Sequence, residues 1–378
     1  MQNNLPFKPL MTAVLMASIF TFSAQAMAMG KLSDVTIDGE HLGEKKGDAI
    51  EVGTDESNKV LIKASAGSPA LANKGNSITV KGKDISVEGK VSENGLDVFV
   101  YDDKGGIANI GNENTNNLTI FAHNAAVRNQ SSKITLDGKN INLYTTQSDR
   151  SNGAVEINGA ENCADSTTVI GKHAETISIS ANQLEGSNIA YDASVVRILH
   201  GGSLSLGSET TKEIKLTSNL KGSSFGIYAE SGRNANQVDI HGESIKITSK
   251  GDETSAGVFA NSNSTLNIGD ANKSNIEIKS TNSVTTGYDA YSFGVWVSNV
   301  DSYGKPSGAV NLSGNSVDIR AEGVGDVYGI FVASNNLDPV TNASLTINAN
   351  KINVEAVSKD ENKASVGIVL MTSPVKSV

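Results

Sequence analysis

The feature that most constrains the fold of this chain is a repeat of short alternating runs, clearest within residues 237–263. Two runs there, Val238–Ile240 and Ile245–Ile247, each place a polar residue between two apolar ones, and the turn HGES separates them. A third run, which begins near Gly257, follows a longer polar loop. Because successive side chains of a strand point to opposite faces, each run predicts a short strand with one buried face.

The same unit recurs along the chain. First runs begin at Val35, Ile50, Ile78, Ala108, Ile134, Thr168, Leu204, Val238, Leu266, Val310 and Leu345. Second runs begin at Val60, Ile85, Leu118, Ile141, Ile177, Ile214, Ile245, Ile276, Val317 and Ile352. Third runs, with Gly second, begin at Phe225, Ala256, Phe293, Tyr328 and Val366. Leu96–Val100 fits the third frame with Asp97 in place of Gly, and residues near 125, 154 and 189 fit it poorly.

The spacing of these runs predicts a solenoid. From Ile50 to Leu345 the repeat averages roughly 33 residues, inside the window of roughly 20–50 residues that solenoids use. One coil cannot bury its own apolar side chains, but stacked coils pair equivalent strands and form continuous apolar columns. We therefore expect an all-β, right-handed parallel three-stranded β-helix of about ten coils. The alternative is a propeller or sandwich of antiparallel hairpins, but a propeller blade needs four strands.

Two kinds of turn separate the first and second runs. One has four residues, as in KGKD and HGES, and the other begins with Gly and is longer, as in GTDESNK and GNENTNN. Gly and Asn suit such turns because they tolerate positive φ angles. The two kinds nearly alternate along the chain.

The two ends of the chain predict export and an open edge. Residues 1–26 read as a signal peptide, with Lys8, an apolar stretch and a small-x-small cleavage site at Ala24-Gln25-Ala26 or, alternatively, Ala26-Met27-Ala28. A membrane anchor is the alternative, but the apolar stretch is shorter than the ~20 residues of a span. Residues 27–49 are expected to cap the β-helix of residues 50–370. The tail 371–378 adds no cap, so we expect a fragment, a docking partner or self-association at this edge.

Composition limits the partners. The net charge of -10 becomes -11 without residues 1–26, which contain one lysine and no acidic residue. An acidic surface argues against nucleic acid and anionic lipid. The single cysteine, Cys163, cannot form an internal disulfide, so stability must come from repetitive packing. We expect no metal and no other cofactor.

The signal peptide, the Gly/Asn/Ser-rich coils and units such as STLNIGDANKSNIEIKS followed by SFGVWVSN resemble passenger domains of bacterial autotransporters of the pertactin-like, adhesin class. The resemblance covers about residues 31–370. It implies a secreted or outer-membrane surface protein that passes through the periplasm and contributes to virulence. Family members carry a C-terminal membrane barrel, and nothing after Leu370 resembles its alternating strands.

The best candidate site is an aromatic column in the third runs. Tyr228, Phe259, Trp296 and Phe331 occupy equivalent positions. Alternation predicts that Phe225, Ile227 and Ala229 face inward and that the four aromatic residues face outward beside a groove of glycines. Exposed aromatic stripes suit glycan and protein ligands. Alternatively, loops 279–292 and 298–308 cover the stripe, or the face assignment is inverted.

Other motifs carry less chemistry. The segment from Gly222 to Gly226 matches G-x-S-x-G, but its last glycine belongs to the repeat, so we interpret the match as a by-product. The pair Asp102-Asp103 lacks the further short motifs of β-helix hydrolases. The five histidines do not follow metal-ligand spacing; they are His41, His123, His173, His200 and His241.

The sequence therefore favours a non-enzymatic, adhesin-like surface protein that binds cell-surface glycans or proteins. A β-helix polysaccharide lyase or hydrolase is the first alternative, and it would need Asp, Lys and Arg clustered on one sheet face. The second alternative is a structural stalk that binds nothing.

Overall fold

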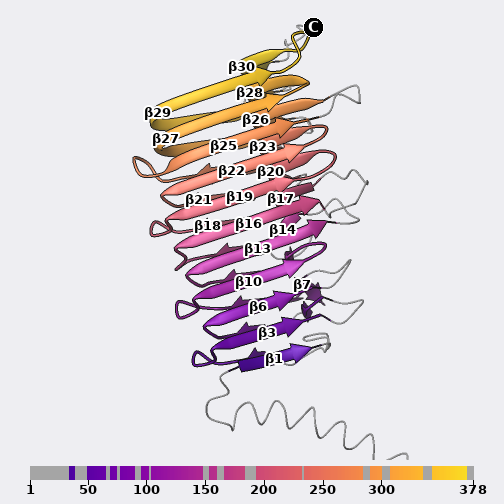
Figure 1. Ribbon diagram of the computed structural model, residues 1–378, viewed down its shortest axis with the longest axis vertical. Coiled ribbons are helices and arrows are strands. Elements are labelled where there is room, and N and C mark those ends of the chain that lie inside the picture. The colour runs from indigo at the N-terminus through magenta and orange to yellow at the C-terminus, as the bar shows by residue number, and fades with distance from the viewer. Residues whose placement is uncertain are drawn as a thin grey trace, which may run out of the picture.

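The computed structural model describes residues 34–38, 49–64, 69–74, 77–89, 95–101, 104–147, 153–159, 166–183, 193–231, 234–283, 290–299, 307–334 and 343–372. Every regular element in these ranges is a strand. The strands stack along one long axis, from β1 at one end to β29 and β30 at the other (Figure 1). Among the described residues, all but one of the strand pairings are parallel, so the expectation of an all-β parallel solenoid is confirmed.

Within the described ranges, the larger sheet, sheet A, has 19 strands and contains two ladders. The ladder of first runs consists of β2 (Ile50–Val52), β5 (Ser77–Val80), β9 (Ile107–Ile110), β12 (Lys133–Leu136), β15 (Ser166–Ile170), β18 (Gly202–Gly207), β21 (Asn236–His241) and β24 (Ser264–Ile268). The ladder of second runs consists of β1 (Asp34–Asp38), β3 (Lys59–Lys63), β6 (Asp84–Glu88), β10 (Asn117–Ala122), β13 (Asn140–Gln147), β16 (Thr176–Gln183), β19 (Glu213–Asn219), β22 (Ser244–Gly251) and β25 (Asn275–Asn282).

The two ladders join near the C-terminal end of the stack. There β27 (Ala309–Gly323) and β29 (Ser344–Ser358) each run through both ladders as one strand of 15 residues. The separate first and second strands expected at these positions are therefore fused. The turns expected within them, SGNS and NANK, keep an extended backbone instead of breaking the strand.

The smaller sheet, sheet B, has 11 strands. Its parallel strands are β4 (Leu71–Lys74), β7 (Leu96–Tyr101), β11 (Val127–Gln130), β14 (Gly153–Asn158), β17 (Ala193–Leu199), β20 (Ser224–Glu230), β23 (Ser255–Asn261), β26 (Tyr291–Asn299), β28 (Asp326–Ser334) and β30 (Ser365–Thr372). The short β8 (Lys104–Gly105) pairs with β7 in antiparallel orientation. Strands β11, β14 and β17 fill the positions where the sequence fitted the third frame poorly.

One core lies between the two sheets. The apolar residues of the first and second runs pair in register from coil to coil, for example Ile247 with Ile278 and Ile278 with Ile319. These side chains are fully buried, and they join the inward residues of sheet B in one continuous cluster. Burial of each such side chain contributes roughly 1.5–3 kcal/mol, so stacking is the main source of stability.

One assigned run was in the wrong ladder. Val35–Ile37 was expected to be a first run, but β1 pairs with β3, and Val35 lies opposite Val60. The run therefore belongs to the second ladder. This assignment explains why only 15 residues separate Val35 from Ile50, because the chain passes there from a second run to the next first run. Alternation within a run does not distinguish the two ladders, since both have the same pattern.

A glycine in the middle of the later sheet B strands changes which side chains face the core. A Cβ atom added to Gly226 would lie 2.4 Å from Ile247 Cγ2, a core atom, so Gly226 faces inward. Ile227 beside it is also in the core. The registers of β20 with its neighbours pair Phe225 and Ile227 and skip Gly226. This local irregularity resembles a bulge, which reverses the alternation of faces.

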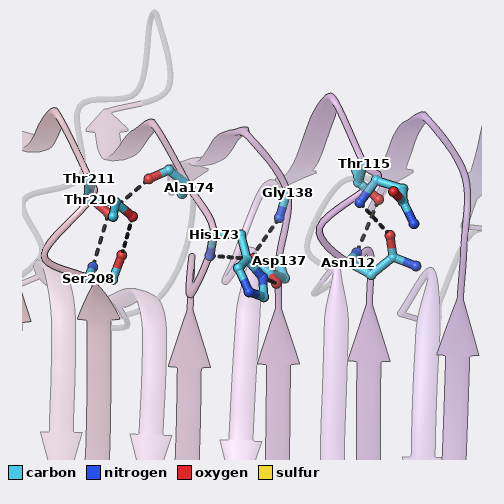
Figure 2. A network of polar contacts seen from close by, with 10 residues as sticks. Asn112, Thr115, Asp137, Gly138, His173, Ala174, Ser208, Thr210 and Thr211 are labelled. Carbon is cyan, nitrogen blue, oxygen red and sulfur yellow. Dashed lines mark hydrogen bonds and ion pairs between the residues drawn. The ribbon is translucent and has the colours of Figure 1, made fainter.

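Buried hydroxyl groups in the long turns bond them to the preceding turns of the stack. Gly111 and Gly207 begin two long turns at φ angles of 75° and 74°. Thr211 Oγ1 accepts a hydrogen bond from the Ser208 N–H at 3.0 Å and donates to the Ala174 carbonyl at 2.9 Å. Thr115 makes the same pair of bonds with Asn112 and a neighbouring four-residue turn. Figure 2 shows these turns side by side along one edge of the stack.

The substitution Gly257→Val tests the inward glycine. A Cβ at Gly257 would lie 2.3 Å from Ile278 Cγ2 and 2.7 Å from the Gly294 carbonyl oxygen. We expect the free energy of unfolding to fall by about 1–3 kcal/mol, as in other overpacked cores. Gly367→Val is the matched control, because nothing lies within 4 Å of a Cβ added at Gly367. Equal urea-denaturation midpoints for the two variants would contradict the inward placement.

The substitution Thr211→Val tests the hydroxyl that joins successive turns. It removes two hydrogen bonds at a buried position, and we expect a loss of about 1–3 kcal/mol in the free energy of unfolding. Thr210→Val makes the same chemical change one residue earlier, where the side chain is exposed. It should change stability by less than about 0.5 kcal/mol. Thermal unfolding followed by circular dichroism compares the two variants.

Candidate functional site

The four predicted site residues lie in one register on sheet B. Tyr228 pairs with Phe259, Phe259 with Trp296, and Trp296 with Phe331. Their inward neighbours in sequence, such as Val258 and Ile330, belong to the core. The four rings therefore lie on the face of sheet B that points away from the core, and they form part of a separate cluster.

A second column of aromatic residues lies beside the first. Phe225 was expected to face inward, but the irregularity at the glycine turns it outward, where it packs against Phe259 at 5.8 Å between ring centroids. Phe293 and Tyr328 occupy equivalent positions in β26 and β28. The predicted outward groove of glycines is therefore wrong. The glycines face the core, and aromatic rings take the place beside the first column.

The rings of the two columns pack against one another. Phe293 stacks on Trp296 with 4.6 Å between centroids and an interplanar angle of 28°, and on Tyr328 with 5.4 Å and 14°. Phe259 meets Trp296 edge to face at 4.6 Å. Burial raises the pKa of the Tyr328 hydroxyl above its ordinary value of 10.0, and Asp326 adds to this effect. The hydroxyl therefore stays neutral and can donate a hydrogen bond.

The rings differ in how far they reach the surface. Phe259 and Phe293 are only 6% and 4% exposed. Tyr228, Trp296 and Phe331 are half-buried. Trp296 Nε1 is buried and has no hydrogen-bond partner within the described ranges. The two columns together form one packed cluster, which we call the aromatic ridge; its members are Phe225, Tyr228, Phe259, Phe293, Trp296, Tyr328 and Phe331. The rings of Tyr228, Trp296 and Phe331 are partly open to solvent.

Charged residues continue the first column toward the N-terminal end. Arg197 pairs in register with Tyr228, Glu156 with Arg197, and Arg128 with both Glu156 and Asp97. We call these eight positions the outer column; its members are Asp97, Arg128, Glu156, Arg197, Tyr228, Phe259, Trp296 and Phe331. The column changes from alternating charges to aromatic rings without leaving its register.

The charged half of the outer column consists of Asp97, Arg128, Glu156 and Arg197. Sequence reasoning missed these residues because it used the glycine to align the third runs. That alignment put Asp97 at the glycine position, whereas the register puts Asp97 in line with Arg128 and hence with Tyr228. The signal that identifies the position is a triplet with a charged residue between apolar or amide residues. It occurs as Val127-Arg128-Asn129, Val155-Glu156-Ile157 and Val196-Arg197-Ile198.

The charged half is held by ion pairs beneath the surface. Arg128 lies 4.0 Å from the Asp97 carboxylate and 3.9 Å from that of Glu156. The two acidic residues are only 2% and 5% exposed, whereas Arg128 and Arg197 are half-buried. Burial makes the carboxylates depend on a nearby positive charge, because an uncompensated buried charge is costly.

Arg197 connects the two halves of the outer column. Its guanidinium carbon lies 5.8 Å from the centre of the Tyr228 ring, in a cation–π contact. The Tyr228 hydroxyl donates to Glu230, and Asn261 Nδ2 donates to the same carboxylate at 3.2 Å. The aromatic ridge therefore has hydrogen-bonding groups along one side and a guanidinium at its N-terminal end.

A smaller aromatic group lies on sheet A. Phe121 and Tyr144 pair in register and stack with 4.7 Å between centroids. His123 meets Phe121 at 5.1 Å, and its Nδ1 lies 2.9 Å from Thr146 Oγ1. The three rings are half-buried. This group provides a control for experiments on sheet B.

The remaining sequence candidates have structural contacts or lie outside the described ranges. Ser224 is buried in β20, where its hydroxyl lies 2.5 Å from that of Ser218. His173 Nδ1 lies 2.6 Å from Asp137, and His241 Nδ1 lies 2.7 Å from Asp270. His200 adopts a positive φ angle. His41, Asp102, Asp103 and Cys163 lie outside the described residues.

The described residues contain no group of three His, Cys, Asp or Glu side chains that could hold a metal ion. No helix among them is long and apolar enough to cross a membrane.

Phe293→Ala tests the packing of the aromatic ridge. Trp296 is the only tryptophan, so its fluorescence reports on this site alone. Removal of the stacked Phe293 ring opens one face of the indole to water, and we expect a red-shifted emission and stronger quenching by iodide. Phe121→Ala removes an outward ring from sheet A and should leave the emission unchanged. Identical quenching of parent and Phe293→Ala would contradict the stacked arrangement.

No protein-family model matches the chain, and neither the curated proteins nor the solved structures contain a match.

Proposed function

We propose that this chain is an exported, adhesin-like surface protein that binds cell-surface glycans or proteins through the outer face of sheet B, without catalysis. The observation that carries this proposal is the aromatic ridge. It lies outside the core on the outer face of sheet B, and Tyr228, Trp296 and Phe331 in it are partly open to solvent. Aromatic side chains that combine an apolar ring with an accessible edge are frequent in ligand contacts.

The proposal includes a finer description of the fold and its setting. We infer a right-handed three-stranded β-helix with coils of roughly 33 residues, since parallel crossovers have that hand. The two ladders of sheet A and the single ladder of sheet B are consistent with it. The resemblance to autotransporter passengers supports a location at the outer membrane or outside the cell. The signal peptide expected in residues 1–26 lies outside the described residues.

Stability alone accounts for part of the ridge but not for its position. Phe225, Phe259 and Phe293 are nearly buried and gain from mutual packing, as in a stalk. However, the same register holds Arg128, Glu156 and Arg197 in earlier coils, which fold on the same core columns. A coil therefore does not need an aromatic residue at this position. Within this register, the aromatic residues Tyr228, Phe259, Trp296 and Phe331 are confined to the later coils, which favours a contact surface.

A second candidate function, polysaccharide cleavage, is favoured by one observation. The sequence appeared to offer only isolated charges, whereas Asp97, Arg128 and Glu156 lie on consecutive strands of one sheet face. Glycoside hydrolysis usually employs a pair of Asp or Glu carboxylates that flank the scissile bond, and here Arg128 separates the two carboxylates along the stack. Both are nearly buried and close to Arg128, so binding remains the first proposal.

The binding proposal is tested with the double variant Trp296→Ala, Phe331→Ala. Both rings are half-buried, so their removal should weaken adhesion to cells or glycan surfaces at least tenfold and keep the β-sheet circular dichroism signal. The control is Phe121→Ala, Tyr144→Ala, which removes two stacked rings from sheet A. Equal adhesion by parent and ridge variant would favour the stalk. Release of new reducing ends during the assay, lost in Glu156→Gln, would favour the hydrolase.

A further inference from the structure

The outer column is long and straight because a parallel register defines it. Six register steps lead from Arg128 to Phe331 through Glu156, Arg197, Tyr228, Phe259 and Trp296. At about 4.8 Å per step, these positions span about 29 Å along the axis of the stack. A ligand that contacts the whole column must be an extended chain that runs across the strands.

The two ends of the column offer different but complementary chemistry. Arg128 and Arg197 are half-buried, and each presents a guanidinium that only donates hydrogen bonds. Tyr228, Trp296 and Phe331 present apolar ring surface at the other end. A partner that fits both ends must accept hydrogen bonds and must also have apolar C–H surface. Saccharide units combine these two properties, with hydroxyl groups at their edges and C–H groups on their faces.

The charge of the column indicates that the saccharide is neutral. Arg128 lies between two buried carboxylates, those of Asp97 and Glu156. Glu156 Oε2 is buried and has no hydrogen-bond partner within the described ranges, so this carboxylate depends on nearby guanidinium charge. An acidic group on the ligand would compete with Glu156 for that charge and would be repelled by it. A neutral hydroxyl group accepts a hydrogen bond from a guanidinium without displacing the carboxylate.

We propose that the outer column binds a neutral, hydroxyl-rich saccharide chain that lies along the axis of the stack. This inference rests on the proposed function and names its ligand class. Arg128 and Arg197 donate hydrogen bonds to saccharide hydroxyls, and Tyr228, Trp296 and Phe331 take the C–H faces of the units further along. The Arg197 contact with Tyr228 holds the guanidinium where the two kinds of contact meet.

A protein partner fits the column less well. The core of a protein–protein interface is depleted in Asp and Glu, whereas the outer column includes the carboxylates of Asp97 and Glu156. A chain of sugar units requires no such depletion, because every unit carries both polar and apolar surface. Binding to protein and not to saccharide is therefore one of the outcomes that the test must detect.

The test uses the purified chain on an array of neutral and acidic oligosaccharides of two to ten units, followed by calorimetry of the best binders. The best binders should be neutral chains, and affinity should rise with length until the span from Arg128 to Phe331 is filled. A neutral ligand also predicts that the dissociation constant changes less than about twofold between 50 and 500 mM NaCl, because no ligand charge is screened.

Arg197→Gln should weaken this binding about tenfold, the usual effect of losing a hydrogen bond from a charged donor. Arg320→Gln is the matched control, since Arg320 is a partly exposed arginine on sheet A that pairs with Glu355. Glu156→Gln provides a second test, because a neutral side chain there should let acidic saccharides bind better. Circular dichroism verifies that each variant is folded.

The outcomes separate this inference from the proposed function. Preference for acidic saccharides, strong salt dependence, or unchanged affinity in Arg197→Gln would overturn the neutral-saccharide inference. If the Trp296, Phe331 double variant still lost adhesion, the proposed function would stand without it. Adhesion that depends on the ridge without binding to any saccharide would indicate a protein ligand and also overturn the inference. Adhesion unchanged in the ridge variant would reject the proposed function itself.

Discussion

Parallel backbone hydrogen bonds between successive coils determine the position of almost every other feature. They bring equivalent residues of neighbouring coils into register, so a side chain that suits one coil meets its counterpart in the next. Ile247, Ile278 and Ile319 form such a column inside the core. The turns follow the same rule, because Thr115 and Thr211 each bond a long turn to the turn of the preceding coil. The energetic unit is thus the contact between neighbouring coils, as in other repeat proteins.

The sequence predicts the ladders well, because apolar residues at period 2 mark the strands of sheet A and the repeat length marks the stacking. It predicts less where the pattern is shared or broken. Val35 was assigned to the wrong ladder because first and second runs look alike. Phe225 was assigned to the wrong face because Gly226 and Ile227 both turn inward. The fusion of two runs in β27 depends on a turn segment that remains extended, and its composition did not reveal this.

The register between coils also explains why the sequence revealed only half of the outer column. Tyr228, Phe259, Trp296 and Phe331 were found because each follows the glycine by two positions, and the register keeps that offset. Asp97, Arg128, Glu156 and Arg197 were missed because the strands that hold them lack that glycine as a guide. Backbone pairing, which no single run encodes, is what brings the two sets together. A face that combines buried ion pairs, a guanidinium and packed rings becomes visible only when the coils are aligned in space.

The inward glycine also separates the evolution of the core from that of the surface. Because Gly257 and Val258 both face the core, the residue that follows them, Phe259, can vary without altering a core contact. Duplication of one coil would add one place to the outer column and lengthen it by a single strand spacing, about 4.8 Å. Evolution could thus lengthen or shorten the outer column by one coil at a time. The outer residue of each coil could also be substituted independently. Each coil would then contribute one position of the outer column, and that position could change without affecting the others.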